Sequence, residues 1–208
     1  PLNLLKKVRE YLARQRRKLE PIVNADGLGE FIDTRSSLVA QTSLYGYIKT
    51  RAGTRFPDLF ENEEFLQSIN IAKWQIWAAC VSDLAVFSGG LLYREMPDAD
   101  RIRQVLQQAI DPLLARTAQP SEAGEDFSTA LEKLKIRIAG APFTDAATSE
   151  NAFTVSPDAL VYWAPIVDEL KSLDESIVRN SIRFRWQAPR RELREALQPA
   201  RVLDSLDN

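Results

Sequence analysis

The chain of 208 residues contains no histidine and a single cysteine, and both shortages limit its chemistry. Without histidine there is no Ser–His–Asp or Cys–His catalysis, no HExxH zinc site and no side chain whose ordinary pKa lies near neutrality. One cysteine excludes an intrachain disulfide and is typical of a reducing compartment. A zinc site built on Cys80 with carboxylates would have a poor ligand set. The sequence therefore predicts no metal and no cofactor.

Motifs that bind phosphate groups or activate a serine are absent as well. The eight glycines form no GxxxxGK phosphate loop, and the chain has neither a GxSxG nucleophile elbow nor an SxxK pair. The stretch GLGEFI at 27–32 places Ile32 where a dinucleotide-binding fingerprint needs its third glycine. Carboxylate pairs such as Glu63 and Glu64 lie at expected helix starts, where acids are common. These absences favour a protein that is not an enzyme and leave open an enzyme with unusual, histidine-free chemistry.

Charge is distributed unevenly, although the formal net charge is only −2. Residues 1–20 and residues 179–201 each hold seven Lys or Arg against two Glu, which leaves residues 21–178 strongly acidic. Either an anionic partner binds the two basic ends, or the ends pair with the acidic middle of the same chain. The isoelectric point near 5.4 argues against a nucleic-acid partner. Residues 1–20 lack the apolar core of a signal peptide, so we expect a cytoplasmic protein.

The apolar residues recur with a helical period along nearly the whole chain and alternate nowhere convincingly. The sequence therefore predicts a single all-α domain of six or seven helices, with a possible sub-boundary in the linker at 118–126. The predicted helices span residues 2–20, 28–53, 62–88, 97–117, 126–139, 157–187 and 189–197.

The most apolar stretch is INIAKWQIWAACVSDLAVFSGGLL, at 69–92. A helix that spans a membrane needs about 20 largely uncharged residues, and a central acid such as Asp83 costs about 2.5–3.5 kcal/mol there. A helix this apolar, yet too short and too polar to span, belongs at the centre of a bundle. We predict a buried central helix near 62–88, with Asn62 as its N-cap and its end at Gly89–Gly90.

The densest candidate site is RNSIRFRWQAPRRELR, at 179–194, where arginines alternate with aromatic residues. Arginine forks suit carboxylates and phosphates, and a tryptophan can anchor an interface. Helical spacing directs Phe184 toward the core, so the remaining set is predicted to be exposed. We expect this basic C-terminal helix to engage an acidic protein partner, and the sequence leaves open that the protein is a homodimer. The predicted binding residues are Arg179, Arg183, Arg185, Trp186, Arg190 and Arg191.

Other stretches suggest weaker alternatives. The sequence YGYIKTRAGTR gathers a secondary set of anion-binding candidates near a predicted helix end, where cations are also common for other reasons. The basic amphipathic segment 2–20, with Leu5, Val8, Leu12 and Leu19 along one stripe, could lie on an anionic membrane or dock on the chain's own core. An apolar pocket near Trp74, Trp77 and Trp163 would suit a small-ligand carrier. The secondary anion candidates are Tyr47, Lys49, Arg51 and Arg55.

Three stretches, SLYGYIKTRAGTRFPDLF, SINIAKWQIWAACVSDL and PDALVYWAPIVDELKSLDESIVRNSIRFRWQ, give the chain a resemblance to a family. The chain resembles a group of uncharacterised alphaproteobacterial helical proteins, some of which are labelled "esterase". The resemblance implies a compact bacterial protein and extends over most of the chain. It brings no catalytic motif, because the chain has neither histidine nor a nucleophile elbow, so no esterase activity is inferred.

Overall fold

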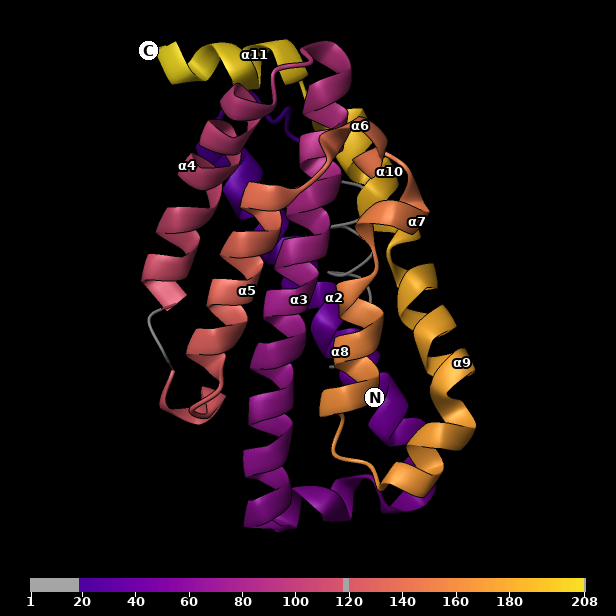
Figure 1. Ribbon diagram of the computed structural model, residues 1–208. Coiled ribbons are helices and arrows are strands. Elements are labelled where there is room, and N and C mark those ends of the chain that lie inside the picture. Colours follow the sequence, from indigo (N-terminus) through magenta and orange to yellow (C-terminus); the bar gives the residue numbers. More distant parts are fainter. Residues whose placement is uncertain (1–18, 118–119, 208) are drawn as a thin grey trace, which may run out of the picture.

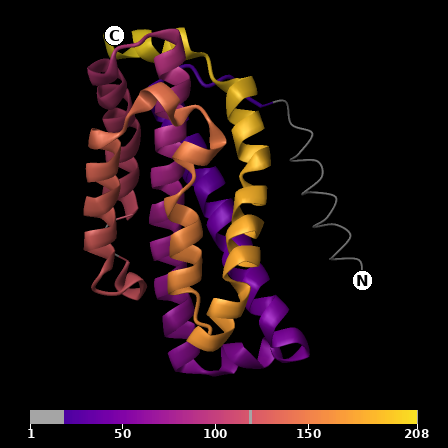
Figure 2. The ribbon, with the colours of Figure 1, turned by 45° about the vertical axis from the view of Figure 1, so that its right-hand side comes forward.

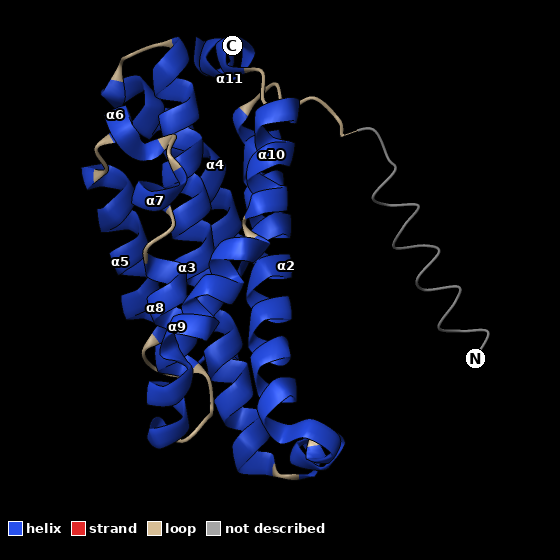
Figure 3. Ribbon diagram, turned by 90° about the vertical axis from the view of Figure 1, so that its right-hand side faces the viewer, coloured by secondary structure: helices blue, strands red, loops and turns tan. Residues whose placement is uncertain are grey.

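The computed structural model describes residues 19–117 and 120–207, and within them the predicted all-α fold is confirmed. Figure 3 shows helices and loops throughout the described part, where the extended contacts amount to one isolated bridge between Ile22 and Leu197. The predicted helix at 2–20 lies outside the described residues except for its last two positions. The predicted linker at 118–126 is partly outside them as well.

The helical periodicity of the sequence located the long helices well and missed the short ones. Chain segments of four to six residues carry too few apolar positions to show a period. The missed helices lie between the predicted helices at 126–139 and 157–187 and after the predicted last helix; they are α6 (Phe143–Ala146), α7 (Ser149–Ala152) and α11 (Pro199–Asp204). The longer described helices are α2 (Ala25–Ala52), α3 (Glu63–Glu95), α4 (Ala99–Thr117), α5 (Phe127–Gly140), α8 (Val155–Trp163), α9 (Asp168–Arg185) and α10 (Gln187–Ala196).

Helix α3 forms the centre of the bundle, as the sequence predicts. The Asn62 side chain caps it by accepting a hydrogen bond from Phe65 N at 2.9 Å. Every residue from Ala78 to Gly90 is buried, including Cys80 and Asp83. By length and composition α3 could cross a membrane, yet 89% of its most apolar window is buried inside this molecule. Its apolar surface is therefore used by the protein's own core.

The other helices enclose α3 on several sides. Helices α2, α4, α5, α6 and α8 all pack directly on it. Figure 1 shows α4 and α5 on one side of α3 and α8 on the other, with α2 behind. Helix α9 forms an outer layer that packs on α8 and α2, and Figure 2 shows it running along the edge of the bundle.

The prediction that α3 ends at Gly89–Gly90 is wrong, because the helix continues to Glu95. These two glycines allow close packing. A Cβ atom at Gly89 would lie 2.3 Å from the Phe143 ring, and one at Gly90 would lie 2.2 Å from the main-chain nitrogen of Ala147. The segment containing α6 therefore lies directly on the α3 backbone, and only glycine leaves room for it.

The chain between α8 and α9 also differs from the prediction. The sequence predicts one helix over 157–187, but two helices are present, with an extended connection from Ala164 to Val167 around Pro165. Proline disfavours helical geometry at the residue before it, which explains the break. Ser156 lies in the first turn of α8, since that helix begins at Val155, two residues before the predicted start at 157.

The close packing at Gly90 predicts a measurable loss of stability. We expect Gly90→Ala to lower the free energy of unfolding by about 1–3 kcal/mol, because the methyl group would overlap the main chain of Ala147. Gly140→Ala is the matched control, since a Cβ atom there meets nothing within 4 Å. Urea unfolding of both variants measures the difference. Equal stabilities for the two variants would contradict the close contact.

Candidate functional site

Trp186 is not an exposed anchor, which corrects the sequence prediction. Its side chain is fully buried, its Nε1–H donates to Ser156 Oγ at 3.0 Å, and its ring lies 4.7 Å from that of Phe153. Phe184, which was predicted to face the core, is 69% exposed. The arrangement of aromatic residues at this end of α9 is therefore the reverse of the predicted one.

The reversal arises because α9 carries two apolar stripes. Val178, Ile182 and Trp186 recur every four residues, and this stripe faces the core. The second stripe contains more apolar residues and includes Phe184, the one that was predicted to face the core. Its large members Leu173, Ile177 and Phe184 are 73%, 69% and 69% exposed. These three residues are called the α9 stripe below.

Some of the predicted binding arginines hold the fold together instead. Arg179 binds Asp158 on α8 and Glu175 on its own helix. The Arg190 guanidinium lies 5.7 Å from the ring centres of both Phe87 and Phe153, and burial lowers its pKa below the usual value. Hence the alternative that the basic end pairs with acids of the same chain holds for Arg179, whereas Arg190 packs on aromatic rings instead.

The remaining arginines of the predicted set are on the surface. Arg183 and Arg185 are exposed, and the Arg191 side chain is 71% exposed at 4.0 Å from Glu195. Arg185 lies across Gly46 of α2, where an added Cβ atom would be 3.1 Å from its Nη2. Arg183 contacts Asn180 Oδ1 at 3.4 Å. Arg183 and Arg185 are therefore exposed cations on the same helix as the α9 stripe, whereas Arg191 lies on α10.

The α9 stripe has the spacing of a helix-pairing surface. Leu170, Leu173, Ile177, Asn180 and Phe184 follow one another at alternating intervals of three and four residues. This interval pattern places side chains along one seam of a helix, as in coiled coils. From Leu173 to Phe184 the seam is about 16 Å long at 1.5 Å per residue. The outer face of α9 can therefore accept another helix along its length.

The four residues predicted as secondary anion-binding candidates do not form one site in the structure. Arg51 binds both carboxylate oxygens of Asp174, which ties α2 to α9, and it holds the pKa of Asp174 below the usual value. Burial and then the nearby Asp174 carboxylate raise the pKa of Tyr47 to about 12. Lys49 and Arg55 are exposed and have no part in this cluster. The anion at this place is thus the chain's own carboxylate.

A buried carboxylate, which the sequence analysis did not single out as a site, organises one end of α8. Asp83 on α3 accepts hydrogen bonds from Val155 N at 3.2 Å and Ser156 N at 2.8 Å, so it caps α8 from a distant part of the chain. Arg137 on α5 donates to Asp83 Oδ1 at 2.6 Å. Complete burial raises the pKa of Asp83, against the attraction of Arg137. Three helices meet at this ion pair.

A groove runs along α3 between α5 and α8. Its volume is about 650 Å³, and small residues of α3 form its floor. Gln75 on this floor is 5% exposed, and its Nε2 has no hydrogen-bond acceptor among the described residues. The walls combine apolar side chains with charged ones of both signs, namely Lys133, Arg137, Asp126 and Asp158. The residues facing the groove from α5 and α8 include Ala130, Lys133, Leu134, Arg137, Val155, Ala159, Tyr162 and Trp163.

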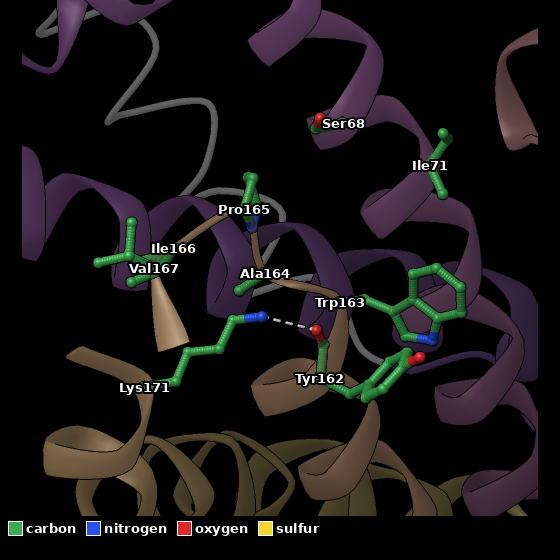
Figure 4. A pocket seen from close by; sticks show the side chains of 9 residues that line it. All are labelled: Ser68, Ile71, Tyr162, Trp163, Ala164, Pro165, Ile166, Val167 and Lys171. Atoms are coloured by element: carbon green, nitrogen blue, oxygen red, sulfur yellow. Dashed lines mark hydrogen bonds between the residues drawn. The ribbon is translucent and has the colours of Figure 1, made fainter. Parts of the chain in front are cut away.

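A second hollow of about 440 Å³ lies beside the groove, and Figure 4 shows its lining. Tyr162 and Trp163 line both spaces, and Lys171 Nζ donates to the main-chain oxygen of Tyr162 at 2.8 Å. The expected pocket near three tryptophans is therefore found beside Trp163 alone. Trp74 and Trp77 pack on each other and on Phe127.

Reactive and metal-binding groups are scarce in the described part of the chain. Cys80 is completely buried, and burial raises the pKa of its thiol well above the usual value. Among the described residues no group of three or more Cys, Asp or Glu side chains could hold a metal ion. Comparison of the chain with protein-family models, curated proteins and solved structures found no match. The function therefore has to be argued from the surface and the groove themselves.

The ion pair at the head of α8 predicts a pH-dependent stability. Arg137→Met leaves the buried Asp83 carboxylate without its counter-ion, so we expect a loss of about 3–5 kcal/mol at neutral pH. Lys133→Met, on the same helix but exposed, is the control and should change stability by less than about 0.5 kcal/mol.

The sign of the pH effect follows from the raised pKa of Asp83. A carboxyl group whose pKa is higher in the folded state favours folding at low pH and loses that contribution as pH rises through the folded pKa. Removing Arg137 raises this pKa further, so the deficit of the variant should shrink as pH falls from about 7 to about 5. Urea unfolding at both values checks this, and a deficit that does not change with pH would contradict it.

Proposed function

We propose that this protein is a non-enzymatic helical binding protein that engages a partner through the outer face of α9. The observation that carries the proposal is the exposure of Leu173, Ile177 and Phe184, about 70% each, on the side of α9 opposite to the core. Large apolar side chains that share one helical seam mark interaction sites more often than scattered ones do. Covering such a side chain contributes about 1.5–3 kcal/mol to binding before association costs.

The chemistry of the surrounding charges indicates the kind of partner. Arg183 and Arg185 lie near the second half of the stripe, and Arg191 follows on α10. Arginine forks bind carboxylates in a defined geometry and tolerate partial burial at interfaces. An amphipathic helix with apolar residues on one side and acidic residues beside them fits this face. The proposal keeps the acidic protein partner expected from the sequence but replaces Trp186 with the α9 stripe as anchor.

Two further parts of the proposal rest on the sequence. We place the protein in the bacterial cytoplasm on the basis of its single cysteine and its resemblance to bacterial helical proteins. Peripheral membrane binding through residues 2–20 stays a prediction, because that segment lies almost entirely outside the described residues. The proposed activity includes no catalytic step.

Variants of the stripe test the proposal. We expect Ile177→Glu and Phe184→Glu to abolish capture of a specific protein from the native host, because each introduces a charge into an apolar contact. Ile136→Glu is the matched control, since Ile136 is an equally exposed apolar residue on α5. All three variants should keep the wild-type melting temperature, because none of these side chains is in the core.

Capture is measured by affinity purification and mass spectrometry against the wild-type protein. A protein that all four forms recover equally would show that the α9 stripe is not the binding face. The proposal is supported only by a protein that the wild type and Ile136→Glu recover and the two stripe variants lose.

A second candidate function is the carriage of a small ligand in the groove over α3. The observation that favours it is Gln75, whose buried Nε2 is a hydrogen-bond donor without an acceptor among the described residues. Leaving such a donor unpaired costs about 1–3 kcal/mol, which a ligand oxygen would recover. The apolar walls and Lys133 suit an aliphatic chain with a carboxylate.

Isothermal titration calorimetry with dodecanoate tests this second candidate. We expect Ala130→Trp, which fills the groove from α5, to weaken binding at least about tenfold. Ala115→Trp on the exposed side of α4 should leave binding unchanged. No heat of binding with the wild-type protein, or equal binding by both variants, would exclude the groove as a site for this ligand class.

A further inference from the structure

We infer that the partner seated on the outer face of α9 is a second copy of this chain, which binds antiparallel through its own α9. This inference rests on the proposed function and names its partner. The α9 seam is then self-complementary, as the interface of a twofold-symmetric dimer has to be. Two features of α9 support a symmetric contact: the order of its charges along the helix, and the spacing of those charges relative to the apolar seam.

Helix α9 changes the sign of its charge along its length. Asp168 and Glu169 lie in its first turn, whereas Arg183 and Arg185 lie in its last. Two copies in antiparallel orientation bring the acidic end of each helix beside the basic end of the other. A parallel pair would place like charges together at both ends, which costs free energy and suppresses that arrangement.

Two charged side chains of α9 that have no ion-pair partner among the described residues are positioned to pair with each other across this contact. Glu169, Ser176 and Arg183 are separated by seven residues each and lie along one flank of the apolar seam. With Ser176 beside the twofold axis, Glu169 of one copy faces Arg183 of the second. Among the described residues no ion pair involves the Glu169 or Arg183 side chain, so both are free to form this bond. The nearby Asp174 is already neutralised by Arg51.

The apolar residues fill the middle of the same arrangement. Leu173 of one copy packs on Ile177 of the second, and the symmetric contact repeats it. Phe184 reaches the extended connection of the second copy near Val167, which is itself 61% exposed. Three stripe residues from each chain make a small interface, so the dimer should dissociate reversibly, with a dissociation constant on the order of micromolar.

The alternative occupant of the outer face of α9 is the amphipathic segment 2–18 of the same chain. The main chain of Ile22 binds Ala196 and Gln198 at the end of α10. If that segment docked on α9, it would have to accommodate Arg183 and Arg185, which lie in the last turn of the helix. Residues 1–20 hold seven Lys or Arg of their own, so this docking would bring like charges together. Charge therefore favours the second copy over the tethered segment.

Sedimentation velocity of the full chain, from about 1 to about 100 µM, tests the inference together with a charge-exchange cycle. We expect a reversible monomer–dimer equilibrium for the wild type. Glu169→Arg and Arg183→Glu should each weaken the dimer at least tenfold, because like charges then face each other. The double variant Glu169→Arg/Arg183→Glu restores opposite charges and should recover most of the wild-type affinity. Circular dichroism checks that each variant remains folded.

The outcomes separate this inference from the proposed function. A wild type that stays monomeric at about 100 µM overturns the second copy, and so does a dimer that all charge variants leave unchanged. If the wild type becomes a dimer only after residues 1–18 are removed, those residues cover α9 and the inference also fails. In each of these cases the proposed function survives if Ile177→Glu still loses a captured protein that Ile136→Glu retains.

Discussion

The structure depends on the burial of α3, a helix that is apolar on nearly every side. From Ala78 to Gly90 no residue of α3 is exposed, so neighbouring elements have to cover it all round. Helices α2, α4, α5 and α8 provide most of that cover, and Gly89 and Gly90 let the segment around α6 approach the α3 backbone. The inward faces of these helices are therefore used by one central partner. Helix α9 is added outside them.

Because α9 lies outside the helices that cover α3, only some of its apolar residues are needed for packing. The helix needs only Val178 and Ile182, with Trp186 at its end, to pack on the bundle. Its opposite stripe has no role in the described fold, and large side chains left exposed there favour association. The arginines follow the same division. Arg179 and Arg190 serve the fold, whereas Arg183 points outward, where it can meet an acid of another chain.

The sequence could predict the helical class, the central helix and its Asn62 cap, because these follow from local period and capping chemistry. It could not choose between the two stripes of α9, because both have a helical period and the choice depends on which neighbour lies beside the helix. Nor could it locate contacts such as Arg51 with Asp174, whose partners are 123 residues apart in the chain. The remote cap that Asp83 provides for α8 was hidden for the same reason. The local sequence pattern locates the helices, whereas tertiary packing determines which face of each helix stays exposed.

The most direct test of the α9 contact is a disulfide across its twofold axis. Cys80 is buried, so a cysteine introduced by Ser176→Cys would be the accessible thiol among the described residues. We expect mild oxidation to link two copies of this variant rapidly, and the addition of Ile177→Glu to prevent the link. Ser121→Cys, at an exposed serine far from α9 in the sequence, should link slowly under the same conditions. Equal rates of covalent dimer formation for the two cysteine variants would contradict the account.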